Sequence, residues 1–187
     1  MGNIVENMGD NIIPEIVKDN LTDINVRYIN YDDVIKNGII TCNKNVSNDL
    51  VSIFRELLNS NFPIKQIKPI TEFNNDDITS VIANNTSCFN YRMVIGSKKL
   101  SDHSTGNAID INPMENPWLH DSIRHIKGLK FDYDEKVKGT VTPEIANIFK
   151  KHGWLWGGDW KNPDYQHFYK PDEELKEKII NSFKNNE

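Results

Sequence analysis

The clearest pattern of apolar and polar positions along the chain is a helical repeat in residues 47–60. Apolar side chains recur there at i, i+4, i+7 and i+8, so they share one face of a helix. These side chains are Leu50, Phe54, Leu57 and Leu58. The pattern predicts an amphipathic helix that packs this face against a core.

Three more segments predict helices, and residues 142–152 are the best marked of them. Thr142 is a residue type that caps a first turn, Pro143 suits the first helical position, and Gly153 follows the end. The second segment has a similar start, with Asp172 as its cap, and the third carries a weaker helical pattern. These two segments are residues 172–183 and 76–82, respectively.

Two short segments predict strands instead. In residues 107–112, Ile109 and Ile111 alternate with Asp110 and its polar neighbours, which is the two-residue period of a strand. Residues 167–169 are a second candidate, ended by a proline. Short strands among helices, without a regular alternation of the two, predict an α+β domain.

Length and composition favour a single globular domain. The 187 residues fit one domain, 37% of them are hydrophobic, and no linker rich in Gly, Ser or Pro divides them. Residues 1–24 form a polar lead-in, in which the apolar patch of residues 12–17 suits either a short helix or a mobile arm. Residues 25–187 form the domain that carries the candidate chemistry.

Charge and hydropathy argue against several kinds of partner. The formal net charge of −5 and the pI of about 5.6 disfavour a nucleic-acid binder, which usually shows a basic stripe. The apolar runs are too short for insertion into a membrane, and residues 1–19 lack the basic start and apolar middle of a signal peptide. We therefore expect synthesis in the cytoplasm, with Cys42 and Cys88 as buried free thiols.

Candidate chemistry is concentrated in residues 101–110. The alternation that turns the two isoleucines toward the core directs Asp110 toward a cleft. Gly106 allows a sharp turn that brings His103 within reach of the same cleft. A catalytic zinc usually has three protein ligands and one open position. His167 is the candidate for the third ligand, and Asp164, three residues earlier, is then free to act as a base.

Residue types alone leave other interpretations open. A single histidine is more often a hydrogen-bonded or surface residue than a ligand, and His120, His125 and His152 belong to that class. An aspartate next to a glycine is ordinarily a turn residue. The acidic residues within 132–135 predict a solvated turn rather than a calcium site, since they lack the glycine and closing glutamate of a calcium loop.

The pattern S-x-H-x-x-G-x-A-x-D in residues 101–110 resembles that of VanY-type D-alanyl-D-alanine carboxypeptidases. Its fixed positions here are Ser101, His103, Gly106, Ala108 and Asp110. The same metallopeptidase family includes D-alanyl-D-alanine dipeptidases and phage L-alanyl-D-glutamate endolysins. Similar stretches on both sides extend the resemblance over roughly residues 25–170. They are residues 84–92, 110–117 and 153–168.

The resemblance implies an α+β fold of the hedgehog/DD-peptidase type, in which a small antiparallel sheet is flanked by helices and a zinc site lies in a central cleft. It implies one Zn²⁺ per chain, bound by His103, Asp110 and His167. It also implies a general base at Asp164 and a substrate-binding cation at Arg92.

Two further residues, Ser101 and Asp159, are expected to support the ligands or their loop through hydrogen bonds. Tyr169 stands where relatives often carry a glutamate. This departure from the family pattern concerns a peripheral contact and not the metal ligands.

The function implied by the resemblance is hydrolysis of a peptidoglycan stem peptide, at the L-alanyl-D-glutamate bond as in endolysins. D-alanyl-D-alanine carboxypeptidase or dipeptidase activity is the alternative within the same chemistry. A non-catalytic, zinc-stabilised module that binds the cell wall is the alternative of another class, and the presence of Asp164 favours an enzyme. We expect the protein to act on the bacterial cell wall after release, without nucleic acid or membrane insertion.

Overall fold

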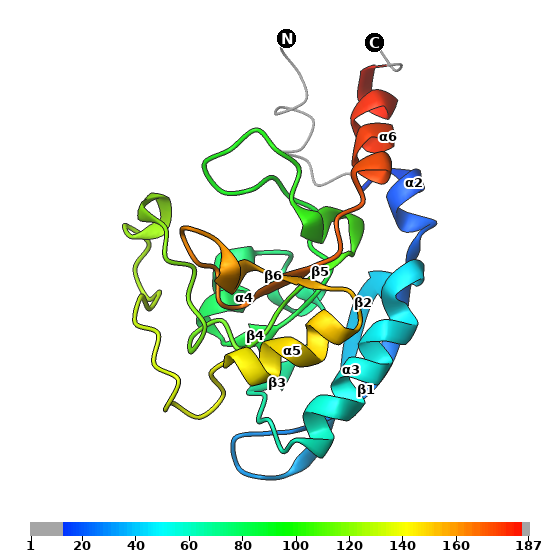
Figure 1. The fold of residues 1–187 in the computed structure, drawn as a ribbon. Coiled ribbons are helices and arrows are strands. Elements are labelled where there is room, and N and C mark those ends of the chain that lie inside the picture. Colours follow the sequence, from blue (N-terminus) through cyan, green and yellow to red (C-terminus); the bar gives the residue numbers. More distant parts are fainter. Residues whose placement is uncertain (1–12, 185–187) are drawn as a thin grey trace.

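A computed structural model describes residues 13–184 of the chain. Within this range the strands form three small sheets, and helices lie against them (Figure 1). The sheets consist of β1 (Leu21–Ile29) with β2 (Ile35–Asn43), β3 (Gln66–Ile67) with β4 (Asn85–Thr86), and β5 (Ala108–Asp110), β7 (His167–Tyr169) and β6 (Leu155–Trp156) in that order. The helices are α2 (Glu15–Lys18), α3 (Ser47–Asn59), α4 (Asp77–Ile82), α5 (Pro143–Lys151) and α6 (Glu173–Lys184). The expected mixture of helices and short strands is confirmed.

The longest strands form an antiparallel hairpin, which the sequence patterns above did not predict. β1 and β2 pair along their whole length, from Leu21 opposite Asn43 to Ile29 opposite Ile35. β1 therefore crosses the domain boundary predicted after residue 24, and that boundary itself stays a prediction.

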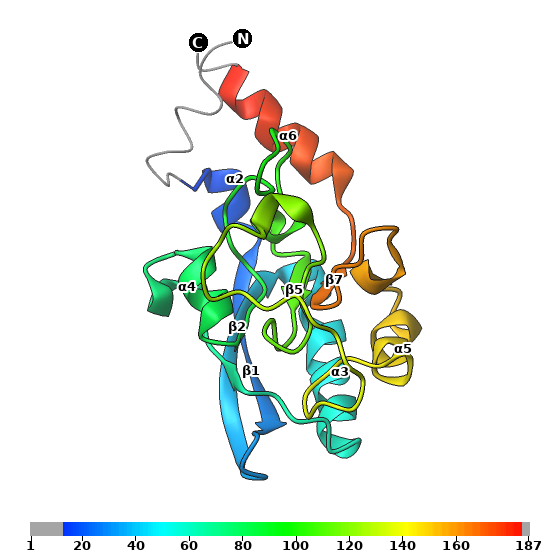
Figure 2. The same cartoon turned by 90° about the vertical axis from the view of Figure 1, so that its left-hand side faces the viewer.

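α3 lies along the hairpin in both views (Figures 1 and 2). This helix confirms the prediction made from residues 47–60, but its buried face differs in one position from the predicted one. Ile53 is fully buried, whereas Leu58 is only half-buried. The buried face of α3 consists of Leu50, Ile53, Phe54 and Leu57.

The three-stranded sheet joins segments that are far apart in the sequence. β7 lies between β5 and β6 and runs antiparallel to both. Ile109 and Phe168 are register partners, and both are buried in the main core. The next pair in the ladder is Asp110 opposite His167. Because neighbouring residues on a strand point to opposite faces, this pair points away from the core, as the alternation predicted for Asp110.

The other predicted helices are present, and α5 begins at its expected cap. Thr142 accepts a hydrogen bond from the backbone of Ile145, and Asp76 accepts one from Thr79. On α5, Phe149 stacks on Phe168 with 3.8 Å between ring centroids. This contact anchors the helix against the three-stranded sheet.

A second apolar cluster joins the two ends of the described chain. α2 and α6 lie at the same end of the molecule (Figures 1 and 2). Val17 of α2 is buried together with Leu175 and Ile179 of α6, and with Tyr91 and Leu100. The apolar patch near residue 16 thus forms a short helix packed on the domain, while residues 1–12 lie outside the described range.

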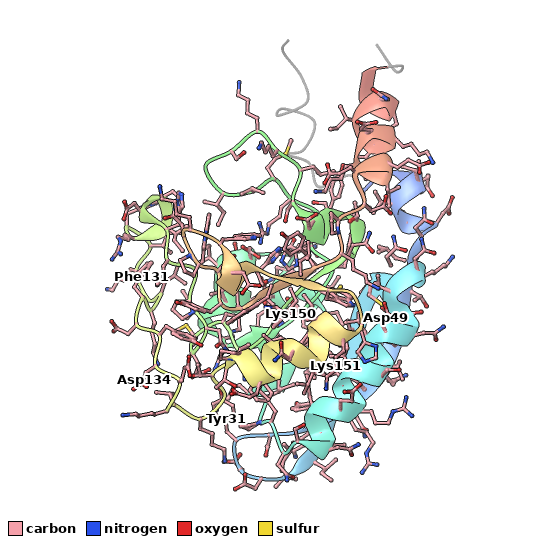
Figure 3. All side chains as sticks on the ribbon, in the orientation of Figure 1. Tyr31, Asp49, Phe131, Asp134, Lys150 and Lys151 are labelled. Carbon is pink, nitrogen blue, oxygen red and sulfur yellow. The ribbon has the colours of Figure 1, made fainter. Side chains whose placement is uncertain are left out.

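Three further expectations can be compared with the fold. Cys42 and Cys88 are buried free thiols, as predicted. The acidic residues between 132 and 135 are exposed, and Asp134 lies at the periphery of the molecule (Figure 3). None of the helices between residues 13 and 184 combines the length and the apolar character needed to cross a membrane.

Candidate metal centre

Three side chains that the motif singled out meet at one point. His103 lies in a 3₁₀ turn (Asp102–Thr105), Asp110 ends β5, and His167 begins β7. The Nε2 atom of His103 is 3.2 Å from Oδ1 of Asp110 and 3.1 Å from Nδ1 of His167. That Nδ1 atom is in turn 3.1 Å from the same Asp110 oxygen. Three potential ligand atoms therefore form a nearly equilateral triangle.

The turn that carries His103 is fixed from both of its ends. The Ser101 hydroxyl accepts a hydrogen bond from the backbone N–H of His103 at 3.3 Å. At the other end, Gly106 has a φ of +73°, and a Cβ there would lie 2.6 Å from the backbone nitrogen of Asn43 on β2. Only glycine fits both the backbone angle and this close approach. The hairpin thus forms the support against which the loop of His103 turns.

The orientation of the His103 ring is fixed by a backbone carbonyl. Its Nδ1 atom lies 2.6 Å from the carbonyl oxygen of Cys88, which can only accept a hydrogen bond. Nδ1 therefore carries the proton, and Nε2 is left with its lone pair directed at Asp110 and His167. This is the tautomer that a metal ligand requires.

The size and charge of the triangle fit a zinc ion. With bonds of about 2.05 Å, a tetrahedral zinc needs ligand atoms about 3.3 Å apart, close to the spacing found here. Burial opposes a charge on His103, but the Asp110 carboxylate raises the pKa of that imidazole, so the pocket attracts positive charge. Burial alone would raise the pKa of Asp110, but the two histidines lower this pKa below its usual value. The Asp110 carboxylate is therefore ionised. Two imidazoles and one carboxylate also leave a fourth position open for water.

Asp164 lies beside these three side chains in the same cavity. Its backbone is held by Gly157, whose carbonyl accepts the Asp164 N–H at 3.0 Å. Burial raises the pKa of Asp164 to about 7, and the charge of Asp110 adds to this shift, while His167, Gln166 and Arg92 oppose it. Its Oδ1 atom is buried without a hydrogen-bond partner among the described residues. A carboxyl of this kind is suited to exchange a proton near neutral pH.

Arg92 reaches the cavity from the segment that follows β4. Its Nε atom is 3.1 Å from Oδ1 of Asp77 on α4, and Asn90 donates a hydrogen bond to the same Asp77 oxygen at 2.9 Å. The Ser104 hydroxyl accepts from the Arg92 N–H and donates to its carbonyl. Both the backbone and the guanidinium of Arg92 are therefore held in place at the cavity wall.

The two expected supporting residues behave differently. Ser101 closes the loop of His103, as described above. Asp159 is instead exposed and forms an ion pair of 2.7 Å with Lys150 on α5. The 3₁₀ turn Gly157–Asp159 directs its carboxylate to this helix, so the expected support of an imidazole by Asp159 is not seen.

Aromatic side chains contact the His167 ring, apolar side chains line the cavity, and most of them carry no signal in the motif. Tyr169 stacks on the His167 imidazole, with 5.3 Å between centroids and 25° between planes. The ring of Trp160 lies 5.5 Å from the same imidazole. Gln166 also faces the cavity. It lies within residues 153–168 of the family resemblance, which implies no role for it. The apolar lining consists of Ile78, Val81, Val94, Ile95, Ile123 and Leu129.

Comparison with known protein families supports the resemblance noted in the motif. Residues 95–170 match the family model described as D-alanyl-D-alanine carboxypeptidase. The matched segment contains His103, Asp110, Asp164 and His167, and Arg92 lies just before it. No protein of curated function and no solved structure matches the chain.

Proposed function

We propose that this chain is an endolysin-like zinc peptidase, a metallopeptidase that acts on peptidoglycan, because residues 95–170 match the family model of D-alanyl-D-alanine carboxypeptidases. It hydrolyses the stem peptide, and we propose the L-alanyl-D-glutamate bond as its target. The observation that carries the proposal is the triangle of His103, Asp110 and His167 beside the buried carboxyl of Asp164. We propose the same three residues as ligands of one zinc ion per chain.

Each residue has a defined task in this mechanism. Zinc, when bound, acts as a Lewis acid and lowers the pKa of water at its open position. Asp164 takes a proton from the attacking water and later passes a proton to the leaving amine. Its raised pKa suits this exchange, because a carboxyl of ordinary acidity would bind the proton too weakly.

Arg92 supplies the positive charge that the substrate meets on the cavity wall. A guanidinium binds a carboxylate through two parallel hydrogen bonds, so we propose that it holds a carboxylate of the stem peptide. The ion pair with Asp77 supports this role, because it keeps the guanidinium at the cavity wall. The alternative of an ordinary surface ion pair is disfavoured by its place in the cavity lining.

The overall architecture belongs to the same proposal. The two candidate ligands on β5 and β7 come from an antiparallel sheet, and the third comes from the loop that precedes it. This arrangement supports a zinc site in a central cleft of the hedgehog/DD-peptidase type. Action on the bacterial cell wall after release follows from the proposed substrate.

The scissile bond is tested by mass spectrometry of muropeptides treated with the zinc-loaded protein. Separation of L-alanine from D-glutamate supports the endolysin-like activity. Loss of a single D-alanine identifies a carboxypeptidase, and loss of a D-alanyl-D-alanine pair identifies a dipeptidase. Binding to peptidoglycan without any cleavage would leave the non-catalytic module as the correct function.

The role of Asp164 is tested in the same assay by Asp164→Ala. We expect cleavage to be lost while elemental analysis still finds one zinc per chain and the thermal midpoint is retained. Unchanged cleavage in this variant would remove Asp164 from the mechanism.

A further inference from the structure

Gln166 lies inside the candidate site, but the proposed mechanism gives it no task. It directly precedes His167, its side chain lines the cavity, and only 8% of the residue is exposed. Its backbone carbonyl accepts a hydrogen bond of 3.0 Å from the N–H of Ile111 at the end of β5. The residue is therefore held in position by the sheet that carries two of the candidate ligands.

The two ends of the Gln166 amide have different surroundings. The N–H end faces Asp164, where hydrogen bonding from Gln166 lowers the pKa of the carboxyl. The carbonyl oxygen, Oε1, is buried and has no hydrogen-bond partner among residues 13–184. Native proteins leave few buried acceptors of this kind unpaired, because an unpaired polar atom loses its water without compensation.

The chemistry of this atom restricts what can satisfy it. An amide oxygen can only accept a hydrogen bond, so its partner must carry an N–H or O–H group. The cavity wall nearby includes apolar side chains such as Ile78 and Trp160, which suit a partner whose body is apolar. A peptide backbone with small side chains combines such a body with N–H donors.

We propose that Gln166 is a substrate-binding residue whose Oε1 atom accepts a hydrogen bond from one backbone N–H of the bound peptide, while its amide N–H holds Asp164. The proposal rests on the proposed function in one respect, namely that a peptide occupies this cavity. According to the proposal, the substrate must carry an N–H donor close to the scissile bond, and Gln166, which is not a metal ligand, recognises this donor.

The test uses a synthetic stem pentapeptide and a series of analogues, each with one backbone nitrogen methylated. Zinc-loaded protein is used for cleavage kinetics, and zinc-free protein is used to measure binding by calorimetry. For the native chain, methylation at one position should lower kcat/KM and the binding constant roughly tenfold, which corresponds to about 1.4 kcal/mol. In Gln166→Met, the unmodified peptide should already show this loss, and methylation at that position should add nothing.

Asn162→Met provides a matched control, because it removes an exposed side-chain amide from the same loop. This variant should keep the full sensitivity to methylation. If the losses from Gln166→Met and from methylation add instead, or if no position in the series is sensitive, the proposal for Gln166 is wrong. These results are distinct from failure of the proposed function, which would appear as binding of the peptide by zinc-loaded native protein without release of any product.

Discussion

Lys176 of α6 forms an ion pair of 2.6 Å with Asp102, the residue that directly precedes His103. Both side chains are mostly buried, with 14% and 20% of their areas exposed. Burial alone would favour a neutral amine, but contact with Asp102 raises the pKa of Lys176, so the amine is charged at neutral pH. The C-terminal helix is thus tied to the turn that presents a candidate metal ligand.

Replacing this lysine should weaken both the fold and the metal site. In Lys176→Met, Asp102 keeps its buried position without a cation, and we expect a loss of about 1–3 kcal/mol in the free energy of unfolding. Zinc affinity should fall roughly tenfold, because residues that orient a ligand contribute to metal binding. Competition with a fluorescent chelator measures the affinity, and chemical denaturation measures the stability.

Lys178→Met is the matched control for that variant. Lys178 lies on the same helix and forms an exposed ion pair of 2.6 Å with Glu174. Its replacement should leave zinc affinity unchanged. Equal affinities in the two variants would show that the link between α6 and the loop of His103 does not support the metal.

Removal of the metal should lower the thermal stability of the protein. An ion that binds only the folded chain stabilises it, by about 2.7 kcal/mol when its concentration is one hundred times its dissociation constant. We therefore expect a chelator to lower the midpoint in calorimetry and added zinc to restore it. In Asp110→Asn, which lacks one charged ligand, the midpoint should hardly respond to zinc. A response equal to that of the native chain would contradict the assignment of Asp110.

The pH dependence of cleavage should report the carboxyl of Asp164. Burial raises its pKa to about 7, and a divalent cation bound beside it lowers that value, because positive charge favours the carboxylate. A general base acts only when deprotonated, so kcat/KM should fall as the pH decreases through this pKa, at or below pH 7. Measurement of kcat/KM between pH 4 and 9, at intervals of about half a pH unit, would define the midpoint of this fall.

Arg92→Met should shift this pH dependence of kcat/KM in a predictable direction. Arg92 lowers the pKa of Asp164, so its loss should move the acidic limb of kcat/KM to higher pH. A limb that stays in place would mean that another group controls the rate in acid.

Asp77 should affect substrate binding through Arg92. In Asp77→Asn the guanidinium loses its fixed partner, and we expect KM to rise roughly tenfold with little change in kcat, which is the signature of lost ground-state binding. A stem peptide whose carboxylate is replaced by a carboxamide should be insensitive to this substitution. Asp121→Asn, which removes an exposed ion pair with Arg124, serves as the control.

The local patterns of the sequence explain part of this fold. The apolar repeat of residues 47–60 predicted α3, and the capping and boundary residues around 142–153 predicted α5. The hairpin was missed although Val26 and Tyr28 alternate with exposed residues on β1. Its turn carries Asp33 in the left-handed region rather than a glycine, so it lacks the strongest hairpin signal.

The candidate site depends on contacts that local patterns do not encode. Asp110 and His167 meet because two strands 57 residues apart pair in one register. Residue types made His167 a candidate ligand, and the family resemblance strengthened that interpretation, but no local pattern predicted the pairing of the two strands. Asp77 and Lys176 approach the site from separate helices, and nothing in their sequence neighbourhoods distinguishes them from surface charges. Their roles follow only from the packing of whole elements around the cavity.

The pairing of β5 with β7 links metal capture to completion of folding. A slip of one residue in this ladder would place Asp110 and His167 on opposite faces, so a misaligned chain would offer the ion no common centre. Uptake of the proposed zinc ion during refolding would therefore record when the two strands have reached their native alignment. An ion added at the start of refolding would accordingly select correctly aligned chains from among those that have collapsed.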